Sequence, residues 1–481
     1  MKFIFFDLAF LALFILFVVV FLYKRRQKLA REGPLFIYRT RFGLKLIEKV
    51  SRHKKFLKIF GMASIVFGYL LMLSAFILLF FSLALLYSST QVPSAPPLAP
   101  VIPYFTSIFK IDFMPPFYFT YWIIIILLIA ISHEFAHGII ARGAGLKIKS
   151  TGFGFLGPFI AAFVEPDEKA MEKKSIKTQL AILSAGSFAN FILALVFVAI
   201  LQLYFLAFYT FGGFIGYMHA IDKINISSIE SITIENSGEN LTLSFDAFSR
   251  LNLSELENKS IKIKVKNQNG KNQSGYQSYQ LDSWLWQEQK KQDFLKKGFI
   301  FAYFDSPARN ANLTGPILEI DGKPIKSSKD IEKILLSKKP NQTILIKTEN
   351  KSYELILASH PSNSSRAFLG IAFFKQGSLI RALSFIYPRF NPSISSKPKF
   401  GNQHSIINFF KDLILWLIII GLSVALFNML PFSIFDGGKV CYLTALAIFK
   451  KKTTARKVYA VFGIIILLLL LLMFGVWLFK I

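Results

Sequence analysis

Six long runs of apolar residues constrain this chain more than any other feature of its sequence. A helix that crosses the hydrocarbon core of a bilayer needs about 20 apolar residues, because each residue advances the helix by about 1.5 Å. Of the 481 residues, 53% are hydrophobic and only 17% are charged. The runs occupy roughly residues 4–23, 60–87, 119–141, 180–210, 409–430 and 458–479. The sequence therefore predicts a multi-pass α-helical membrane protein with about six transmembrane helices and one long polar insert.

The positive charges gather in short segments beside these runs. A net charge of +28 would favour nucleic-acid binding in a soluble protein. Here segments 24–58, 142–177 and 439–457 are basic, whereas segment 88–118 holds a single lysine. The positive-inside rule then predicts that the three basic segments are cytoplasmic, and that residues 211–408 and both termini are extracytoplasmic. We expect the lipid bilayer as a partner and no nucleic acid.

The first apolar run is expected to remain as an anchor in the cell membrane. Its positive charges follow the apolar stretch instead of preceding it, as in a reverse signal anchor. A cleaved signal peptide is the alternative.

The long polar stretch is expected to hold inserted α/β domains. Residues 296–372 alternate as strands do, with one helical segment near 328–336. They resemble a PDZ domain, as shown by the turn Ser306-Pro307-Ala308 and by ILEIDGKPI at 317–325. The usual Gly-Asp of that domain is here Gly315-Pro316. Residues 211–290 repeat the rhythm loosely, as a degenerate second PDZ-like unit would; a generic β-rich domain is the alternative.

Residues 133–137, HEFAH, place three titratable side chains at the end of the third apolar run. Histidines at i and i+4 of a helix lie on one face, so His133 and His137 can bind one Zn²⁺. Glu134 lies beside them, where it can accept a proton from an attacking water. Ionisable groups within a transmembrane helix cost several kcal/mol and usually serve a function. The alternative is that they merely end a helix at the membrane surface.

A catalytic zinc site needs a third protein ligand and one open position. The acids of VEPDEK at 164–169 are expected to form a solvated loop. Asp436 is a better candidate, because it follows the fifth apolar run on the side predicted for HEFAH. Pro431 and Gly437-Gly438 interrupt the helix there, so the backbone can line a wet cavity.

These motifs together resemble the site-2 protease family of intramembrane zinc metalloproteases. The resemblance is carried by HEFAH and by N-x-x-P-x-x-x-x-D-G-G at 428–438. Residues 143–168 resemble the Gly-rich hairpin of archaeal members, and AGSFAN at 185–190 resembles the family motif G-x-x-x-N. The family often has a second proline where this chain has Ile434.

The resemblance implies a set of roles for these residues. His133, His137 and Asp436 would bind one zinc ion, and Glu134 would be the general base. Asn190 and Asn428 would hydrogen-bond to the substrate or to the oxyanion; the alternative is that they form hydrogen bonds between helices. The hairpin that contains Gly152, Gly154 and Gly157 would capture an unwound substrate as an added strand.

The implied substrates are membrane-anchored single-span proteins, cleaved near the cytoplasmic face. The PDZ-like region would select substrates by docking or size. Two alternatives remain open: a non-catalytic or zinc-handling scaffold related to the family, and a zinc peptidase that acts on soluble peptides.

The expected organisation places a split catalytic core on either side of the insert. Residues 1–118 would hold two transmembrane helices, and 441–481 the last one. The other expected parts are 119–210 and 409–440 (the core), 211–290 and 296–372 (the PDZ-like units) and 373–408 (a connector that is irregular over 388–403).

Overall fold

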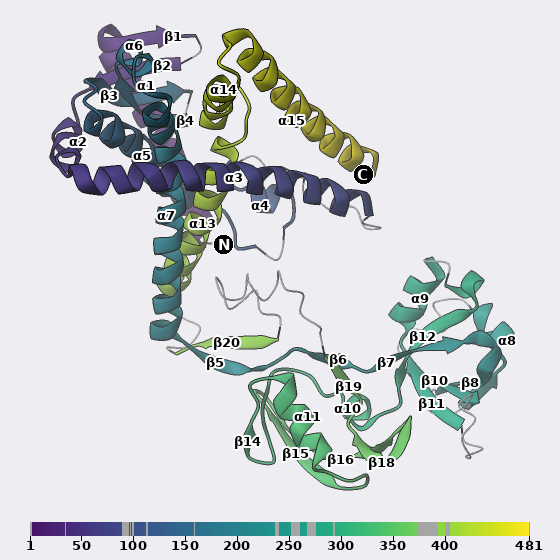
Figure 1. Ribbon diagram of the computed structural model, residues 1–481. Helices are drawn as coiled ribbons and strands as arrows, with labels where there is room; N and C mark the ends of the chain where they lie inside the picture. Colours follow the sequence, from purple (N-terminus) through teal and green to yellow (C-terminus); the bar gives the residue numbers. More distant parts are fainter. Residues whose placement is uncertain are drawn as a thin grey trace. The chain divides into compact units, whose positions relative to one another are not determined.

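The chain forms two compact units in the computed structural model (Figure 1). The first comprises Met1–Tyr204 and His404–Ile481, and the second comprises Phe205–Gln403. The structure describes residues 2–33, 35–88, 96, 98, 101–111, 114–157, 159–235, 240–251, 260–266, 276–291, 294–373, 393–399 and 405–480.

Among the described residues, six helices are long and apolar enough to cross a membrane, which confirms the predicted number. They are α1 (Lys2–Arg25), α3 (Lys54–Ser88), α5 (Phe119–Gly143), α7 (Ile176–Phe208), α13 (Ser405–Asn428) and α15 (Lys452–Lys480). The shorter helices that lie among them are α2 (Leu44–Ser51), α4 (Phe105–Ile108), α6 (Glu168–Glu172), α14 (Asp436–Phe449) and the 3₁₀ turn η1 (Arg26–Lys28).

Small residues let the long helices pack closely. A Cβ built on Gly68 of α3 would lie 2.9 Å from Cβ of Ser184 on α7, so only glycine fits at this crossing. Close to it, the Ser64 hydroxyl donates a hydrogen bond to the carbonyl oxygen of Ala181, 3.1 Å away. Close backbone approach and such interhelical hydrogen bonds hold membrane helices together without a hydrophobic driving force.

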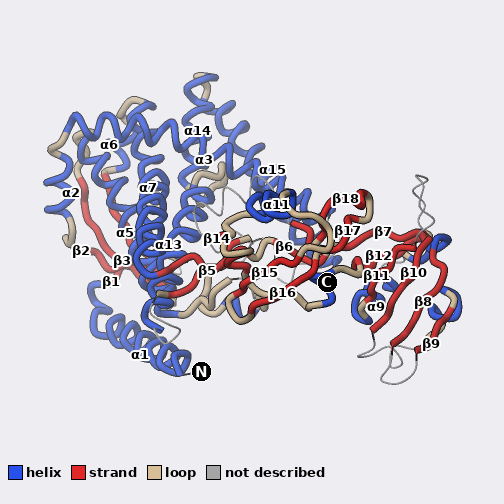
Figure 2. Tube along the Cα trace, turned by 90° about the horizontal axis from the view of Figure 1, so that it is seen from below, coloured by secondary structure: helices blue, strands red, loops and turns tan. Residues whose placement is uncertain are grey.

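A four-stranded antiparallel sheet lies beside these helices (Figure 2). Its strands, in spatial order, are β1 (Leu29–Glu32), β2 (Leu35–Thr40), β3 (Ile148–Leu156) and β4 (Phe159–Pro166). The hairpin of β3 and β4 is the one expected from residues 143–168. Strands β1 and β2 were not expected: they form within the basic segment after the first transmembrane helix and extend the hairpin.

The described residues of the second unit form two larger sheets and two two-stranded ones. The first sheet has the order β7 (Ile221–Asn225), β12 (Phe299–Phe304), β11 (Tyr276–Leu281), β10 (Ser260–Lys266), β8 (Ile229–Glu235), β9 (Asn240–Leu243). The second has the order β16 (Ser352–Ile356), β15 (Thr343–Thr348), β13 (Ile317–Ile320), β5 (Tyr209–Phe214), β20 (Ile394–Pro398), with β14 (Lys323–Pro324) on β13. The small sheets pair β17 (Ala358–His360) with β18 (Asn363–Phe368), and β19 (Ile371–Phe373) with β6 (Tyr217–His219).

Short helices cover these sheets and complete two separate cores. Trp286 and Phe248 are fully buried in the first core, and Ile331 in the second. The helices and turns of this unit are α8 (Phe245–Ser249), α9 (Ser283–Lys291), α10 (Pro307–Asn310), α11 (Ser328–Leu336), η2 (Ile226–Ser228) and η4 (Leu295–Lys297). Helix α11 matches the helix expected near 328–336.

Two strands lie where the sequence suggested otherwise. Strand β12 begins the segment 296–372, yet it joins the upstream sheet, because Ile300 and Ala302 fill the first core. Strand β20 lies within the segment expected to be irregular, and that expectation is wrong for Ile394–Pro398, which pairs with β5. The fold is that of a multi-pass membrane protein with an inserted α/β region.

Candidate metal centre

Helix α5 carries the HEFAH motif inside one of the candidate membrane spans, Phe119–Gly143. His133 and His137 project from one face of the helix, and their side chains are only 10% and 12% exposed. The apolar residues on either side account for this local structure, since they favour a helix that satisfies its own backbone hydrogen bonds.

Asp436 reaches the same place from a different part of the chain. Helix α13 ends at Asn428, a tight turn follows, and Asp436 is the first residue of α14. Gly437 and Gly438 allow the backbone of the turn to approach the start of α14 closely. A Cβ on Gly437 would collide with the carbonyl group of Met429, and one on Gly438 with that of Phe432. The Asp-Gly-Gly sequence thus folds the turn back against the start of α14 and presents the carboxylate to α5.

The three side chains form a cluster of the size that one zinc ion requires. Oδ2 of Asp436 lies 3.2 Å from Nε2 of His133 and 3.2 Å from Nε2 of His137, and the two nitrogens lie 3.0 Å apart. Two ligand atoms on a tetrahedral zinc ion, each about 2.0–2.1 Å from the metal, are separated by roughly 3.3 Å. Within the described residues, these are the only three His, Cys, Asp or Glu side chains that meet in this way.

The backbone of α7 fixes the tautomer of His137. Nδ1 of the ring lies 2.6 Å from the carbonyl oxygen of Ile182, an acceptor, so Nδ1 carries the proton and donates it. Nε2 then keeps its lone pair and faces the cluster. This is the arrangement that metal-binding histidines adopt when their second nitrogen is hydrogen-bonded.

Asn190 of α7 holds the ring of His133. It is fully buried, with its amide nitrogen 3.3 Å from Nδ1 of His133 and its amide oxygen 2.7 Å from the hydroxyl of Ser132. That hydroxyl has one proton but faces two acceptors, since the carbonyl oxygen of Ile129 lies 3.0 Å away. Exchanging the amide oxygen and nitrogen, which are assigned from their surroundings, resolves the conflict. The amide oxygen then accepts Nδ1–H of His133, and Nε2 is free to bind a metal.

Gly186, one turn before Asn190, gives the two rings room against α7. A Cβ built on it would lie 2.6 Å from Cε1 of His133 and would collide with Nε2 of His137. Any side chain at this position would displace the rings. The G-x-x-x-N motif therefore supplies the space and the hydrogen bond that orient the histidines.

Glu134, next to the first histidine of the cluster, also contacts the sheet. Its Oε2 accepts a hydrogen bond from the backbone N–H of Val164 on β4, at 3.0 Å. That N–H faces outward, because β4 is the last strand of the sheet and pairs only with β3 among the described residues. The free edge of β4 thus lies directly beside the HEFAH motif.

The structure corrects the role expected for Gly152 and Gly154. Both lie in β3, and this strand pairs with β2 on one side and with β4 on the other. A third strand therefore has no edge to join at these glycines, and the outer strands of the sheet are β1 and β4. Gly157 lies in the turn after β3, with φ +59°.

Asn428 is not brought into the cluster by any hydrogen bond. It is the last residue of α13, and its side chain forms no hydrogen bond with the part of the chain that the structure describes. Its expected role in binding substrate therefore stays a prediction.

The acids of VEPDEK have partners outside the cluster, but the expectation of a solvated loop is wrong, because Glu165 lies in β4 and Glu168 begins α6. Glu165 accepts hydrogen bonds from Ser150 Oγ at 2.6 Å and from Arg39 Nε at 3.2 Å. The Ser150 bond first, and then the Arg39 guanidinium, hold the pKa of Glu165 below its usual value of 4.5. Asp167 caps α6 by accepting from the backbone N–H of Ala170. These contacts stabilise the sheet and leave Asp436 as the candidate for the third ligand.

One buried carboxylate was missed by the sequence reasoning. Asp7, 1% exposed on α1, accepts hydrogen bonds from the backbone N–H groups of Phe119 and Thr120, at 2.8 and 2.9 Å. Tyr104 donates a further one, at 2.6 Å. A carboxylate at a helix N-terminus satisfies unpaired N–H groups and favours the helix dipole. The signal in the sequence was a single acidic residue within the first apolar run. The hydrogen bonds of Asp7 hold the N-terminal end of α5 against α1.

Comparison with known proteins agrees with this geometry. The family model described as "Peptidase family M50" matches residues 121–472, which is more than half of the chain and includes all the residues of the cluster. The chain is also similar to an uncharacterized protein of Methanocaldococcus jannaschii, with 35% identity over 198 residues. That alignment covers 39% of this chain, and the chain spans about half (49%) of the length of this relative. This chain belongs to peptidase family M50, the site-2 protease family.

Proposed function

We propose that this chain is a zinc-dependent intramembrane endopeptidase that hydrolyses peptide bonds of membrane-anchored, single-span proteins. The observation that carries the proposal is the approach of Asp436 to His133 and His137 of a candidate membrane span, beside Glu134. Membership of family M50 supports the same reaction class. The donor set, two neutral imidazoles and one carboxylate with a position left open, is the kind that catalytic zinc sites use.

The residues of the chain divide the work of hydrolysis. Zinc, when bound, lowers the pKa of water to about 7 and polarises a carbonyl group. Glu134 takes the proton from the attacking water and returns it to the leaving amine, so that no charged leaving group forms. The Ile182 carbonyl and Asn190 keep the two imidazoles in the neutral tautomer that can act as a ligand.

The free edge of β4 would present the substrate to this centre. A transmembrane helix hides its peptide carbonyls in its own hydrogen bonds, so a segment must unwind before one can be cleaved. Successive outward-facing groups along an edge strand belong to alternate residues, here Ile160, Ala162 and Val164. An unwound segment that pairs with Ile160 and Ala162 would gain backbone hydrogen bonds and would lead to Glu134, which accepts the N–H of Val164.

Two observations weigh against the alternative functions. A zinc-handling or scaffold protein needs the ligands but not Glu134, and this side chain lies one position from a ligand with its carboxylate beside the open strand edge. A peptidase for soluble peptides would expose its centre beyond the bilayer, whereas the two histidines lie inside a candidate span. The basic segments further favour cleavage near the cytoplasmic face.

Cleavage of a single-span model substrate by the purified full-length chain tests the proposal. Wild-type protein should cleave, and a zinc chelator should abolish cleavage. Glu134→Gln should retain zinc but lower the rate by at least ~10²-fold, as expected on removal of a general base. Cleavage that persists in Glu134→Gln, or after chelation, would exclude this mechanism, and zinc binding without cleavage in the wild type would favour the scaffold.

A further inference from the structure

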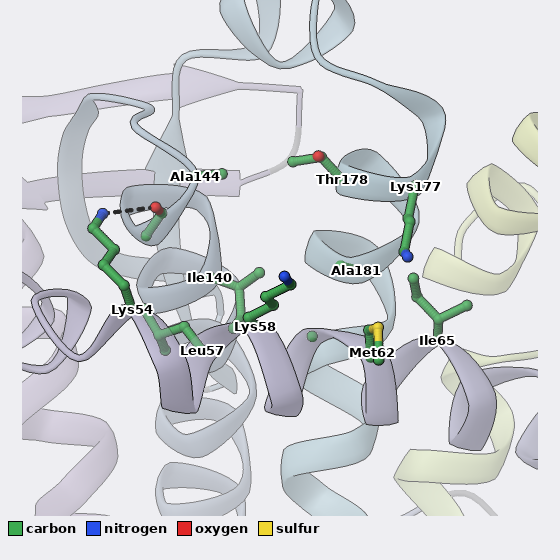
Figure 3. A pocket seen from close by; sticks show the side chains of 12 residues that line it. Lys54, Leu57, Lys58, Met62, Ile65, Ile140, Ala144, Lys177, Thr178 and Ala181 are labelled. Carbon is green, nitrogen blue, oxygen red and sulfur yellow. Dashed lines mark hydrogen bonds between the residues drawn. The ribbon is translucent and has the colours of Figure 1, made fainter.

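A cavity of about 300 Å³ lies between three helices of the first unit, and its lining includes none of the three residues of the candidate metal centre. Its wall is formed by the first turns of α3, the last turn of α5 and the first turns of α7 (Figure 3). It is far larger than a single water molecule needs. Lys54 spans one side by donating a hydrogen bond to the carbonyl oxygen of Gly143, at 2.8 Å, which ties α3 to the end of α5.

Three lysines bring positive charge to this cavity from distant parts of the chain. Lys54 and Lys58 lie one turn apart on α3, and Lys177 is contributed by the start of α7. Among the described residues, the twelve that line the cavity include no Asp or Glu, and no carboxylate there pairs with any of the three ammonium groups. An anion is the ligand that these charges favour.

The rest of the lining is apolar and continues onto the surface of α3. Leu57, Met62 and Ile65 of α3 and Ile140 of α5 form the floor. On α3, Ile59, Met62 and Val66 are 70%, 49% and 57% exposed, and they recur at i, i+3 and i+7 along one face. A molecule that binds here would therefore meet positive charge at one end and a strip of apolar helix surface beyond it.

We propose that this cavity binds one anionic phospholipid of the surrounding bilayer. The phosphate would lie between Lys58 and Lys177, and an acyl chain would extend along the Ile59–Met62–Val66 face of α3. The position fits such a ligand, since the cavity opens where a candidate membrane span meets a basic segment. A bound lipid would bridge α3 and α7 beside the end of the helix that carries HEFAH. This binding does not depend on proteolytic activity.

Native mass spectrometry of the full-length chain in detergent tests the proposal by counting bound lipids. Phosphatidylglycerol should bind at one site more tightly than phosphatidylcholine, and salt should weaken this preference. The double variant Lys58→Gln/Lys177→Gln should bind phosphatidylglycerol roughly thirtyfold more weakly, because each lysine near an anionic lipid contributes about 1 kcal/mol and the two losses add.

The matched control is Lys55→Gln/Lys173→Gln, which removes two exposed lysines of the same segments that do not line the cavity. It should bind phosphatidylglycerol as the wild type does. Equal loss in both double variants would show only a general charge effect and would overturn the proposal. Binding of phosphatidylcholine as tight as that of phosphatidylglycerol, or displacement of the lipid by inorganic phosphate alone at comparable concentration, would also overturn it.

Discussion

A histidine that binds zinc through Nε2 must carry its proton on Nδ1, and for His133 that nitrogen faces Asn190. Asn190 of α7 is fully buried, and its amide contacts Ser132 and His133 of α5. Of the two roles that its motif suggested, substrate binding and contact between helices, the geometry favours the second, with the added task of holding a ligand.

We therefore predict that Asn190→Leu lowers the affinity for zinc by about 10- to 100-fold, the usual effect of removing the partner of a metal-binding histidine. Competition with a chromogenic chelator measures this affinity. Asn428→Leu is the matched control, because its amide forms no hydrogen bond with the described residues. If both variants bind zinc as tightly as the wild type, Asn190 does not orient His133.

The three residues of the cluster were predictable from sequence, and the groups that orient their side chains were not. His133 and His137 follow from helical spacing, and Asp436 from being an acid beside a broken apolar run. No feature of the sequence distinguishes Ile182 from other apolar residues, or Ser132 from other serines, although the carbonyl of Ile182 contacts His137 and the hydroxyl of Ser132 contacts Asn190. Only the crossing of α5 and α7 gives these groups a function, and a linear pattern does not contain that crossing.

At the scale of elements, the four-stranded sheet decides where a substrate strand can bind. Strand β2 occupies one side of β3, so the glycine-rich strand is an interior strand and the edge strands are β1 and β4. Of these two edges, β4 is the one hydrogen-bonded to helix α5, through Val164 and Glu134. The hairpin was predictable from its glycines and alternating residues, whereas β1 and β2 were hidden in a segment whose charge suggested a loop.

A proline in β4 tests the open edge. Ala162 lies two residues before Val164, so its N–H also faces outward, and Ala162→Pro removes that donor without breaking a bond to β3. We predict that the cleavage rate falls by at least roughly threefold, because the variant loses the free energy of one hydrogen bond to the substrate. The zinc content should be unchanged. Ala162→Val, which keeps the N–H, should cleave near the wild-type rate. Equal rates for the two variants would argue against strand addition.

At the scale of the whole molecule, the chain enters and leaves its second unit through one pair of strands. Strands β5 and β20 are antiparallel, with Phe211 opposite Ser396 and Tyr209 opposite Pro398. The apolar runs and the charge pattern were sufficient to predict six membrane helices and an insert. They were not sufficient to show that β12 belongs to the upstream sheet or that β20 closes the insert, because both depend on pairing between distant segments.

This pairing permits a clean test of substrate selection. Residues 213–394 can be replaced by a short Gly-Ser turn that joins β5 to β20, since paired strands lie only about 5 Å apart. If the insert selects substrates, the shortened chain should cleave full-length and trimmed single-span substrates at similar rates, whereas the intact chain should prefer the trimmed one. An unchanged preference in a side-by-side cleavage assay would contradict selection by the insert.

The most direct test of the proposed centre measures bound zinc and substrate cleavage in the same preparations of wild type and Asp436→Ala. We predict one zinc ion per wild-type chain, and the loss of both zinc and cleavage in the variant, because two histidines alone leave the site one protein ligand short. Asp436→Ala protein that still holds one zinc ion per chain and cleaves its substrate at the wild-type rate would contradict the assignment.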